Sequence, residues 1–183
     1  PAASPTLEPR ERKRLLESAD NLTDRLAALR QILRQPSGTE VDETLAAFYD
    51  QWQEELLVIN QWFSVQATMP GDLAVERVRS LLNHAAFDWR NPNKVRALIG
   101  AFANANPTGF HRKDGAGYQL LADAVVELQA ANPQIAARLC SPLSKFQRFA
   151  HGQSLMKAQL QRIASVADLS RDVFEVVDRS LSH

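Results

Sequence analysis

Apolar residues recur at helical spacing along almost the whole sequence, and this periodicity constrains the fold more than any other feature. Side chains that repeat every three or four residues lie on one face of a helix. Two clear examples are the runs Leu22, Leu26, Leu29, Leu33 and Val95, Leu98, Ile99, Phe102. No stretch alternates β-branched and polar residues, and glycine is scarce. We therefore predict an all-α protein.

Breaks in this periodicity predict nine or ten helices joined by short connectors. Beyond the two runs above, the expected helices cover residues 6–18, 72–83, 118–130, 133–149 (interrupted at Pro142), 153–166 and 170–182. The apolar stripe from Leu45 to Phe63 meets no breaker before Pro70. It therefore predicts either one long helix or two helices joined near Glu54 and Glu55.

Short connectors between helices of this length favour stacked antiparallel pairs. We predict a single domain over residues 1–183, folded as an irregular α-superhelix of helix pairs in the HEAT-like manner. A compact orthogonal bundle is the alternative. No repeated sequence motif is visible, so the chain is not an obvious repeat protein at the level of sequence.

The stretch from Phe87 to Tyr118 contains several strong helix boundaries. Asn91 before Pro92 predicts a helix start, because Asn caps the first amides and Pro suits the first helical position. Asn106 before Pro107 predicts the end of that helix. Residues 114–117, Asp-Gly-Ala-Gly, are expected to supply positive-φ positions for a tight turn. Farther along, Ser170 is the expected cap of the last helix.

Composition excludes several classes of function. Lysine plus arginine equals aspartate plus glutamate, at 21 each, whereas nucleic-acid and anionic-membrane proteins usually carry a basic excess. No apolar run approaches the length of a membrane span, and no signal-peptide pattern opens the chain. The sequence begins at Pro1 without a methionine. We therefore expect neither nucleic acid nor membrane as a partner, and we expect a piece of a longer protein.

No catalytic or metal-binding motif is present in the sequence. The histidines include no pair four residues apart and no His-Glu-x-x-His. His111 and Asp114 lie close enough to share a metal, but two ligands do not make a site, and we interpret His111 as a packing residue beside Phe110. Cys140 is the single cysteine, which we expect to be buried among apolar neighbours.

Six segments resemble the C-terminal helical domain of bacterial aminopeptidase N, of the gluzincin family of zinc metallopeptidases. They are residues 21–30, 59–68, 87–103, 110–118, 132–139 and 169–177, the third and fourth reading FDWRNPNKVRALIGAFA and FHRKDGAGY. The resemblance covers nearly the whole chain in the family's order. It implies an α-superhelix that caps a catalytic domain lying upstream in the same polypeptide.

The resemblance also implies the chemistry of the parent enzyme. That enzyme would be a cytoplasmic, zinc-dependent exopeptidase that removes N-terminal residues from peptides, with its zinc held by the upstream domain. This chain would hold no cofactor and no catalytic residue, and it would wall the active-site cavity and control peptide access. The resemblance assigns Arg96, Gln134 and Arg138 to the substrate channel.

Two other functions remain open at this point. One is a free-standing helical scaffold that binds a partner protein. The other is a small enzyme with an unrecognised site. Read without the resemblance, Arg96 and Arg138 are ordinary surface or capping residues, and Asn91 and Asn93 belong to a helix start.

Overall fold

The helices of this protein form a short array of antiparallel pairs. The computed structural model describes residues 11, 14, 21–33 and 39–182, so the helix expected over 6–18 falls almost entirely outside them. The described helices follow one another as α2 (Leu22–Leu33), α3 (Thr39–Trp52), α4 (Leu56–Ala67), α5 (Ala74–Leu82), α6 (Pro92–Val95), η1 (Arg96–Gly100), α7 (Ala101–Ala105), α8 (Pro107–Phe110), α9 (Ala116–Leu128), α10 (Pro133–Leu139), α11 (Ser141–Ser144), η2 (Phe146–Arg148), α12 (Gln153–Ala164) and α13 (Arg171–Leu181).

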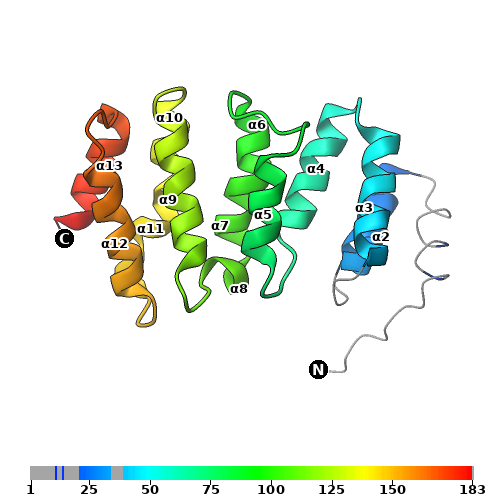
Figure 1. Cartoon of the computed structure of the whole chain (residues 1–183), viewed down its shortest axis with the longest axis horizontal. Helices are drawn as coiled ribbons and strands as arrows, with labels where there is room; N and C mark the ends of the chain where they lie inside the picture. Colours follow the sequence, from blue (N-terminus) through cyan, green and yellow to red (C-terminus); the bar gives the residue numbers. More distant parts are fainter. Residues whose placement is uncertain (1–10, 12–13, 15–20, 34–38, 183) are drawn as a thin grey trace.

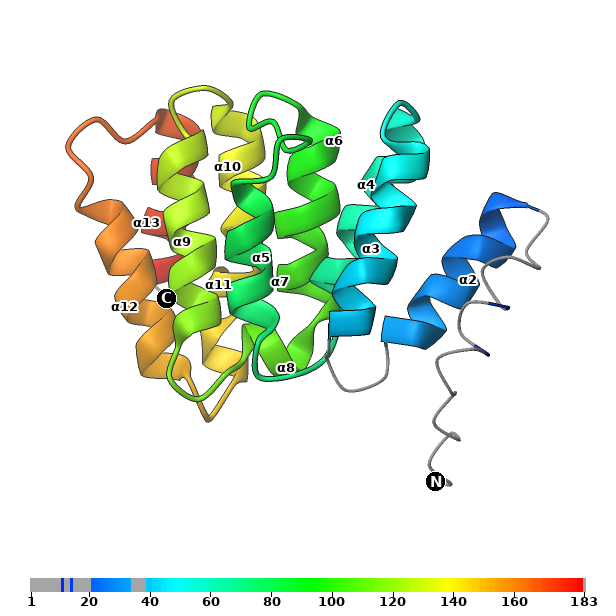
Figure 2. The ribbon, with the colours of Figure 1, turned by 45° about the vertical axis from the view of Figure 1, so that its right-hand side comes forward.

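The helices lie in two layers (Figures 1 and 2). We call α3, α5, α9 and α12 the front layer, and α4, α6–η1–α7, α10–α11 and α13 the rear layer. Neighbours pack within each layer, as α9 does against α12 and α10 against α13. They also pack between layers, as α9 does against α10 and α12 against α13. The predicted all-α superhelix of helix pairs is confirmed.

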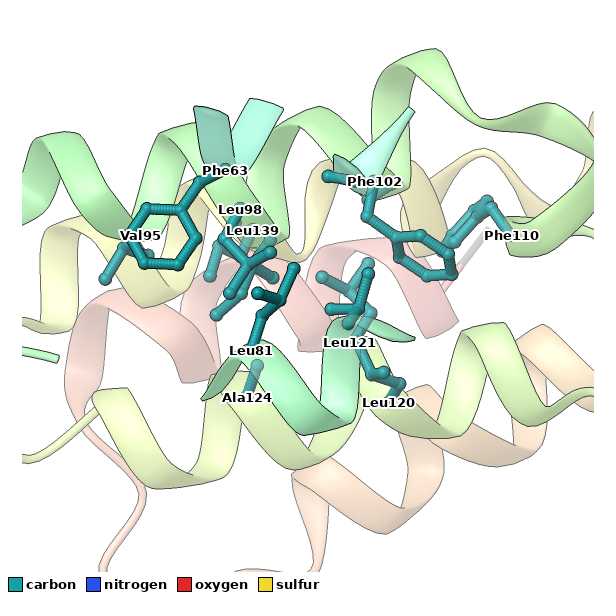
Figure 3. Close-up of a cluster of buried hydrophobic side chains, with 14 of the residues drawn as sticks. Phe63, Leu81, Val95, Leu98, Phe102, Phe110, Leu120, Leu121, Ala124 and Leu139 are labelled. Atoms are coloured by element: carbon teal, nitrogen blue, oxygen red, sulfur yellow. The ribbon is translucent and has the colours of Figure 1, made fainter. Parts of the chain in front are cut away.

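The core fills the space between the two layers. Leu98 and Leu139 of the rear layer meet Leu81 and Ala124 of the front layer (Figure 3). The predicted stripe of Val95, Leu98, Ile99 and Phe102 has 0% exposure at each position. Burial of an aliphatic or aromatic side chain of this size stabilises the fold by roughly 1.5–3 kcal/mol. The apolar periodicity therefore identified the face that joins the layers.

Asparagine–proline steps begin three helices of this array. The Asn91 side chain accepts hydrogen bonds from the amides of Asn93 and Lys94, at 3.0 and 3.4 Å. Asn106 begins α8 and Asn132 begins α10 in the same way, each followed by proline at the first helical position. These caps satisfy amides that have no partner within the helix. The predicted helix boundaries at Asn91 and Asn106 are confirmed.

The rod formed by α6, η1 and α7 contains a π-helical segment that the sequence did not predict. Its backbone stays helical through Arg96 and Ala101, but residues Arg96–Gly100 take the wider π spacing. The hydroxyl of Ser64 in α4 donates to the carbonyl oxygen of Ala97 at 3.0 Å. A carbonyl oxygen within the widened segment thus accepts a hydrogen bond from the neighbouring helix α4. Side chains that insert at such bulges often form this kind of bond.

Three details differ from the sequence predictions or decide between them. The Leu45–Phe63 stripe forms two helices, since residues 53–55 separate α3 from α4. Gly115 has a φ of 76°, but Gly117 lies inside α9 and has no positive φ. Ser170 precedes α13, yet its hydroxyl is buried without a partner, so the predicted side-chain cap is wrong. Its amide donates instead to the Gln129 side chain at 2.7 Å.

Candidate functional site

Arg96, Gln134 and Arg138 all lie on exposed sides of rear-layer helices. Arg96 begins η1, and its guanidinium donates a 3.0 Å hydrogen bond to the side-chain oxygen of Asn93. The neighbours Val95 and Leu98 face the core, so the helical period directs Arg96 away from it. This contact orients the guanidinium but leaves most of its donors open to solvent.

Gln134 and Arg138 are one turn apart on α10. Ile135, Ala136 and Leu139 are buried, and α10 packs against α9 and α13, whereas Gln134 and Arg138 are exposed to solvent. The predicted common face of Gln134 and Arg138 is therefore consistent with their exposure. Arg96 lies on the next rod of the same layer.

Arg138 lines a pocket between α10–α11 and α13. The pocket has a volume of about 330 Å³ and is also lined by Ala137, Ser141, Ser144, Val176, Arg179 and Ser180. Neither Arg138 nor Arg179 makes a hydrogen bond or ion pair among the described residues. Arg96 and Gln134 are not part of this pocket. The structure thus joins Arg138 to α13, a helix that the sequence analysis left without a role.

A second pocket of about 380 Å³ lies in the front layer, between α5 and α9. Its charged residues have opposite signs, since Arg79 faces Asp123 and Glu127 across the groove. Asp123 already accepts a hydrogen bond of 2.6 Å from Arg162 of α12. With its charges balanced in this way, the groove shows no preference for an anion or a cation.

The conspicuous Phe-His-Arg motif before α9 is built into the packing. The Nδ1 atom of His111 lies 2.9 Å from the hydroxyl oxygen of Tyr118. The His111 ring also stacks on Phe149, with centroids 4.3 Å apart, and packs edge-on against Phe110 at 4.9 Å. Burial lowers the pKa of His111, which favours the neutral ring. The prediction that His111 packs beside Phe110 is confirmed.

Arg112 ties this turn to the start of α5. Its guanidinium donates to Asp114 at 2.9 Å, to Glu76 at 2.9 Å and to the carbonyl oxygen of Asp72 at 2.8 Å. These bonds to Arg112 hold the pKa values of Asp114 and Glu76 below their ordinary range. Asp114 is therefore engaged with Arg112, and the structure shows no contact that joins it to His111.

The remaining groups with metal-binding or nucleophilic chemistry are dispersed or buried. Within residues 21–33 and 39–182, no three His, Cys, Asp or Glu side chains are grouped so that they could hold a metal ion. Cys140 is buried, as predicted, and burial raises the pKa of its thiol to about 12. None of the helices described is both long and apolar enough to cross a membrane.

Comparison with known families agrees with this architecture. The family model described as a domain of unknown function (DUF3458_C) with ARM repeats matches residues 3–182. The chain belongs to this family. The repeats in this chain are therefore structural. Stacked helix pairs recur along the chain, although no sequence motif repeats.

Known aminopeptidases contain a similar domain. Aminopeptidase N of Haemophilus influenzae is 43% identical over 165 residues, which cover 90% of this chain and 19% of the relative. Aminopeptidase N of Escherichia coli is 39% identical over the same shares. The crystal structure of Legionella pneumophila aminopeptidase A in complex with aspartic acid matches with a TM-score of 0.89 and 35% identity, over 95% of this chain and 20% of that one. The chain therefore spans about a fifth of the length of these relatives.

Arg179 and the serines that line the pocket with it were not predicted from the sequence. Val176, Arg179 and Ser180 have the spacing of one helix face, so the signal for a shared surface was present. That this face meets Arg138 depends on the packing of α13 against α10, which no local pattern encodes.

Proposed function

We propose that this chain is the helical cap domain of a zinc-dependent aminopeptidase that removes N-terminal residues from peptides in the cytoplasm. The observation that carries the proposal is the 43% identity to an aminopeptidase N across 90% of the chain. In this proposal a catalytic domain of the same polypeptide holds the zinc and performs the hydrolysis. The described residues contribute no bond-making group.

The role of the cap is exclusion and steering. A cavity closed by the rear layer would exclude bulk water and strengthen electrostatic interactions inside it. Arg96 and Arg138 are exposed cations, and Gln134 adds an amide that can donate and accept hydrogen bonds. Such groups attract the carboxylates and backbone carbonyls of a peptide that enters the cavity.

Exposed leucines at the start of α4 support contact with another domain. Leu56 is 63% exposed and Leu57 is 78% exposed, although seven of the other ten residues of α4 are buried. Adjacent exposed apolar side chains of this size usually mark a contact surface. In the proposed enzyme the catalytic domain covers them.

Arg138→Ala in the full-length enzyme tests the steering role. We expect the Michaelis constant for peptides to rise by up to about tenfold, since a charge-assisted hydrogen bond is worth roughly 1.5–3 kcal/mol when well formed and less in water. A single-residue amide reporter, which has no downstream residues, should be hydrolysed almost as before.

The matched control is Arg79→Ala, which removes the same charge from the front layer. Equal losses on the peptide and the reporter would contradict steering by Arg138. A full-length protein that hydrolyses neither substrate, with its zinc site loaded, would remove the aminopeptidase proposal itself.

A further inference from the structure

The pocket between α10–α11 and α13 concentrates positive charge. Arg138 and Arg179 both contribute to its wall, and neither guanidinium is neutralised by a carboxylate of the described residues. The carboxylate one turn before Arg179 on α13 belongs to Glu175, which accepts a hydrogen bond of 2.8 Å from Arg171. The wall therefore presents two guanidinium groups that form no ion pair with a carboxylate of the described residues.

The alternative explanation is that each arginine merely offsets a helix dipole. Arg138 lies in the last turn of α10 and Arg179 in the last turn of α13. A helix end carries about half an elementary charge, so two ends amount to about −1 against the +2 of the guanidinium groups. An excess of about one positive charge remains, and α10 continues almost directly into α11, which reduces the negative end further.

The rest of the lining suits a ligand with an apolar part. Ala137 and Val176 form an apolar floor, to which the aliphatic stems of the arginines add. The volume of about 330 Å³ is at the lower end of the range for small-molecule pockets. A ligand that fills it is therefore no larger than one or two amino-acid residues.

Hydroxyl groups complete the polar side of the pocket. The Oγ atoms of Ser144 and Ser180 are 2.9 Å apart. Each also has a carbonyl within reach on its own helix, Cys140 O at 3.1 Å and Val176 O at 2.6 Å. Because a hydroxyl rotates freely, either group can turn from its carbonyl and donate to an incoming oxygen. Ser141, which also lines the pocket, has no hydrogen-bond partner among the described residues for its hydroxyl.

We propose that this pocket binds the carboxylate of a small amphipathic acid, with Arg138 and Arg179 as the charged partners and an apolar side chain on the Ala137–Val176 floor. A planar carboxylate matches the two-pronged donor geometry of guanidinium. The site rests on the proposed function only for the source of that carboxylate, which would be the end of a peptide. The binding itself requires no enzyme activity.

Binding to the 183-residue chain tests the site directly. We would titrate the ¹⁵N-labelled protein with N-acetyl-leucine, N-acetyl-leucinamide and inorganic phosphate and follow amide shifts of Ala137, Ser144 and Ser180. N-acetyl-leucine should bind about tenfold more tightly than its neutral amide, and more tightly than phosphate, which has no apolar part. Arg138→Gln and Arg179→Gln should each weaken binding of N-acetyl-leucine about tenfold.

Arg79→Gln is the charge-matched control in the other pocket, and it should leave the affinity unchanged. Equal affinity for the acid and the amide, tighter binding of phosphate, or an equal loss with Arg79→Gln would overturn the proposal. The amide spectrum of each variant reports whether it is folded. The binding result and the kinetic result are separable. An enzyme without steering by Arg138 could still bind the acid in this pocket, and an enzyme that steers peptides through Arg138 could fail to bind the acid here.

Discussion

The side-chain amide of Asn106 donates a 2.7 Å hydrogen bond to the carbonyl oxygen of Met69, 37 residues earlier in the chain. The same amide donates to Ala67 at 2.9 Å, and its oxygen accepts from the amide of Gly109 at 3.0 Å. Asn106 is only 2% exposed. One side chain therefore both begins α8 and closes the end of α4.

Replacing Asn106 with alanine should be far more costly than replacing a similar cap. Asn106→Ala leaves two carbonyls and an amide without partners in a buried place, at about 1–3 kcal/mol for each unsatisfied group. We expect the free energy of unfolding to fall by about 3 kcal/mol or more. Asn132→Ala, which removes a single 3.2 Å cap bond at α10, should cost about 1 kcal/mol. Urea denaturation measures both, and equal losses would show that the links from Asn106 to α4 contribute nothing.

Two glycines should respond to alanine with opposite signs. A Cβ at Gly117 would lie 2.4 Å from the carbonyl oxygen of Phe110 and 2.7 Å from that of Gly109. These are backbone atoms that cannot rotate away, so Gly117→Ala should destabilise the protein by about 1–3 kcal/mol or more. A Cβ at Gly100 would meet only Arg96, at 3.8 Å. Gly100→Ala should therefore stabilise the helical rod by about 0.5–1 kcal/mol, and thermal unfolding would show the contrast.

Stability should fall as the pH is lowered through the range below 6.5. Burial lowers the pKa values of His84 and His111 from the ordinary value of 6.5. Below that value the unfolded chain binds more protons than the folded one, so protonation favours unfolding. The stabilising contribution is complete above pH 6.5 and is lost as the pH falls through the folded pKa. The urea midpoint at pH 5.5 should thus be lower than at pH 7.5.

His111→Gln checks the origin of this pH dependence. It removes one of the two partly buried imidazoles, so the difference between the midpoints at pH 7.5 and 5.5 should shrink. His151→Gln, at an exposed histidine, is the control. A pH difference that His111→Gln leaves intact would assign the effect to other groups.

Cys140 should be unreactive while the protein is folded. Its thiol is buried, its pKa is raised to about 12, and it donates to the carbonyl oxygen of Ala136 at 3.5 Å. Relative to an ordinary thiol of pKa about 8.5, the thiolate fraction at pH 8 falls by roughly three orders of magnitude. We expect a disulfide reagent to modify Cys140 at least 10³ times more slowly in buffer than in urea. Rapid modification of the folded protein would reveal an opening of the α10–α11 region.

Local patterns predicted most of the helices because they record which face of each helix is buried. The stripe from Val95 to Phe102 and the Asn-Pro caps were confirmed at the level of single residues. The π-helical turn at Arg96–Gly100 was not predictable, since it coincides with a hydrogen bond from Ser64, on a different helix. Ser170 failed as a cap because Gln129 bonds its backbone while its hydroxyl stays buried and unpaired.

By itself, the sequence determined the all-α class, most of the helix boundaries, the absence of a familiar catalytic motif and, through its resemblance, the family. Each of these conclusions depends on residues a few positions apart or on segments that resemble a known family. Only the tertiary structure brought Arg138 and Arg179 into one pocket, and engaged Arg112 with Glu76 of α5. The physical reason is that helix packing sets which exposed faces meet, and that geometry depends on contacts across 40 residues or so, which no local period contains.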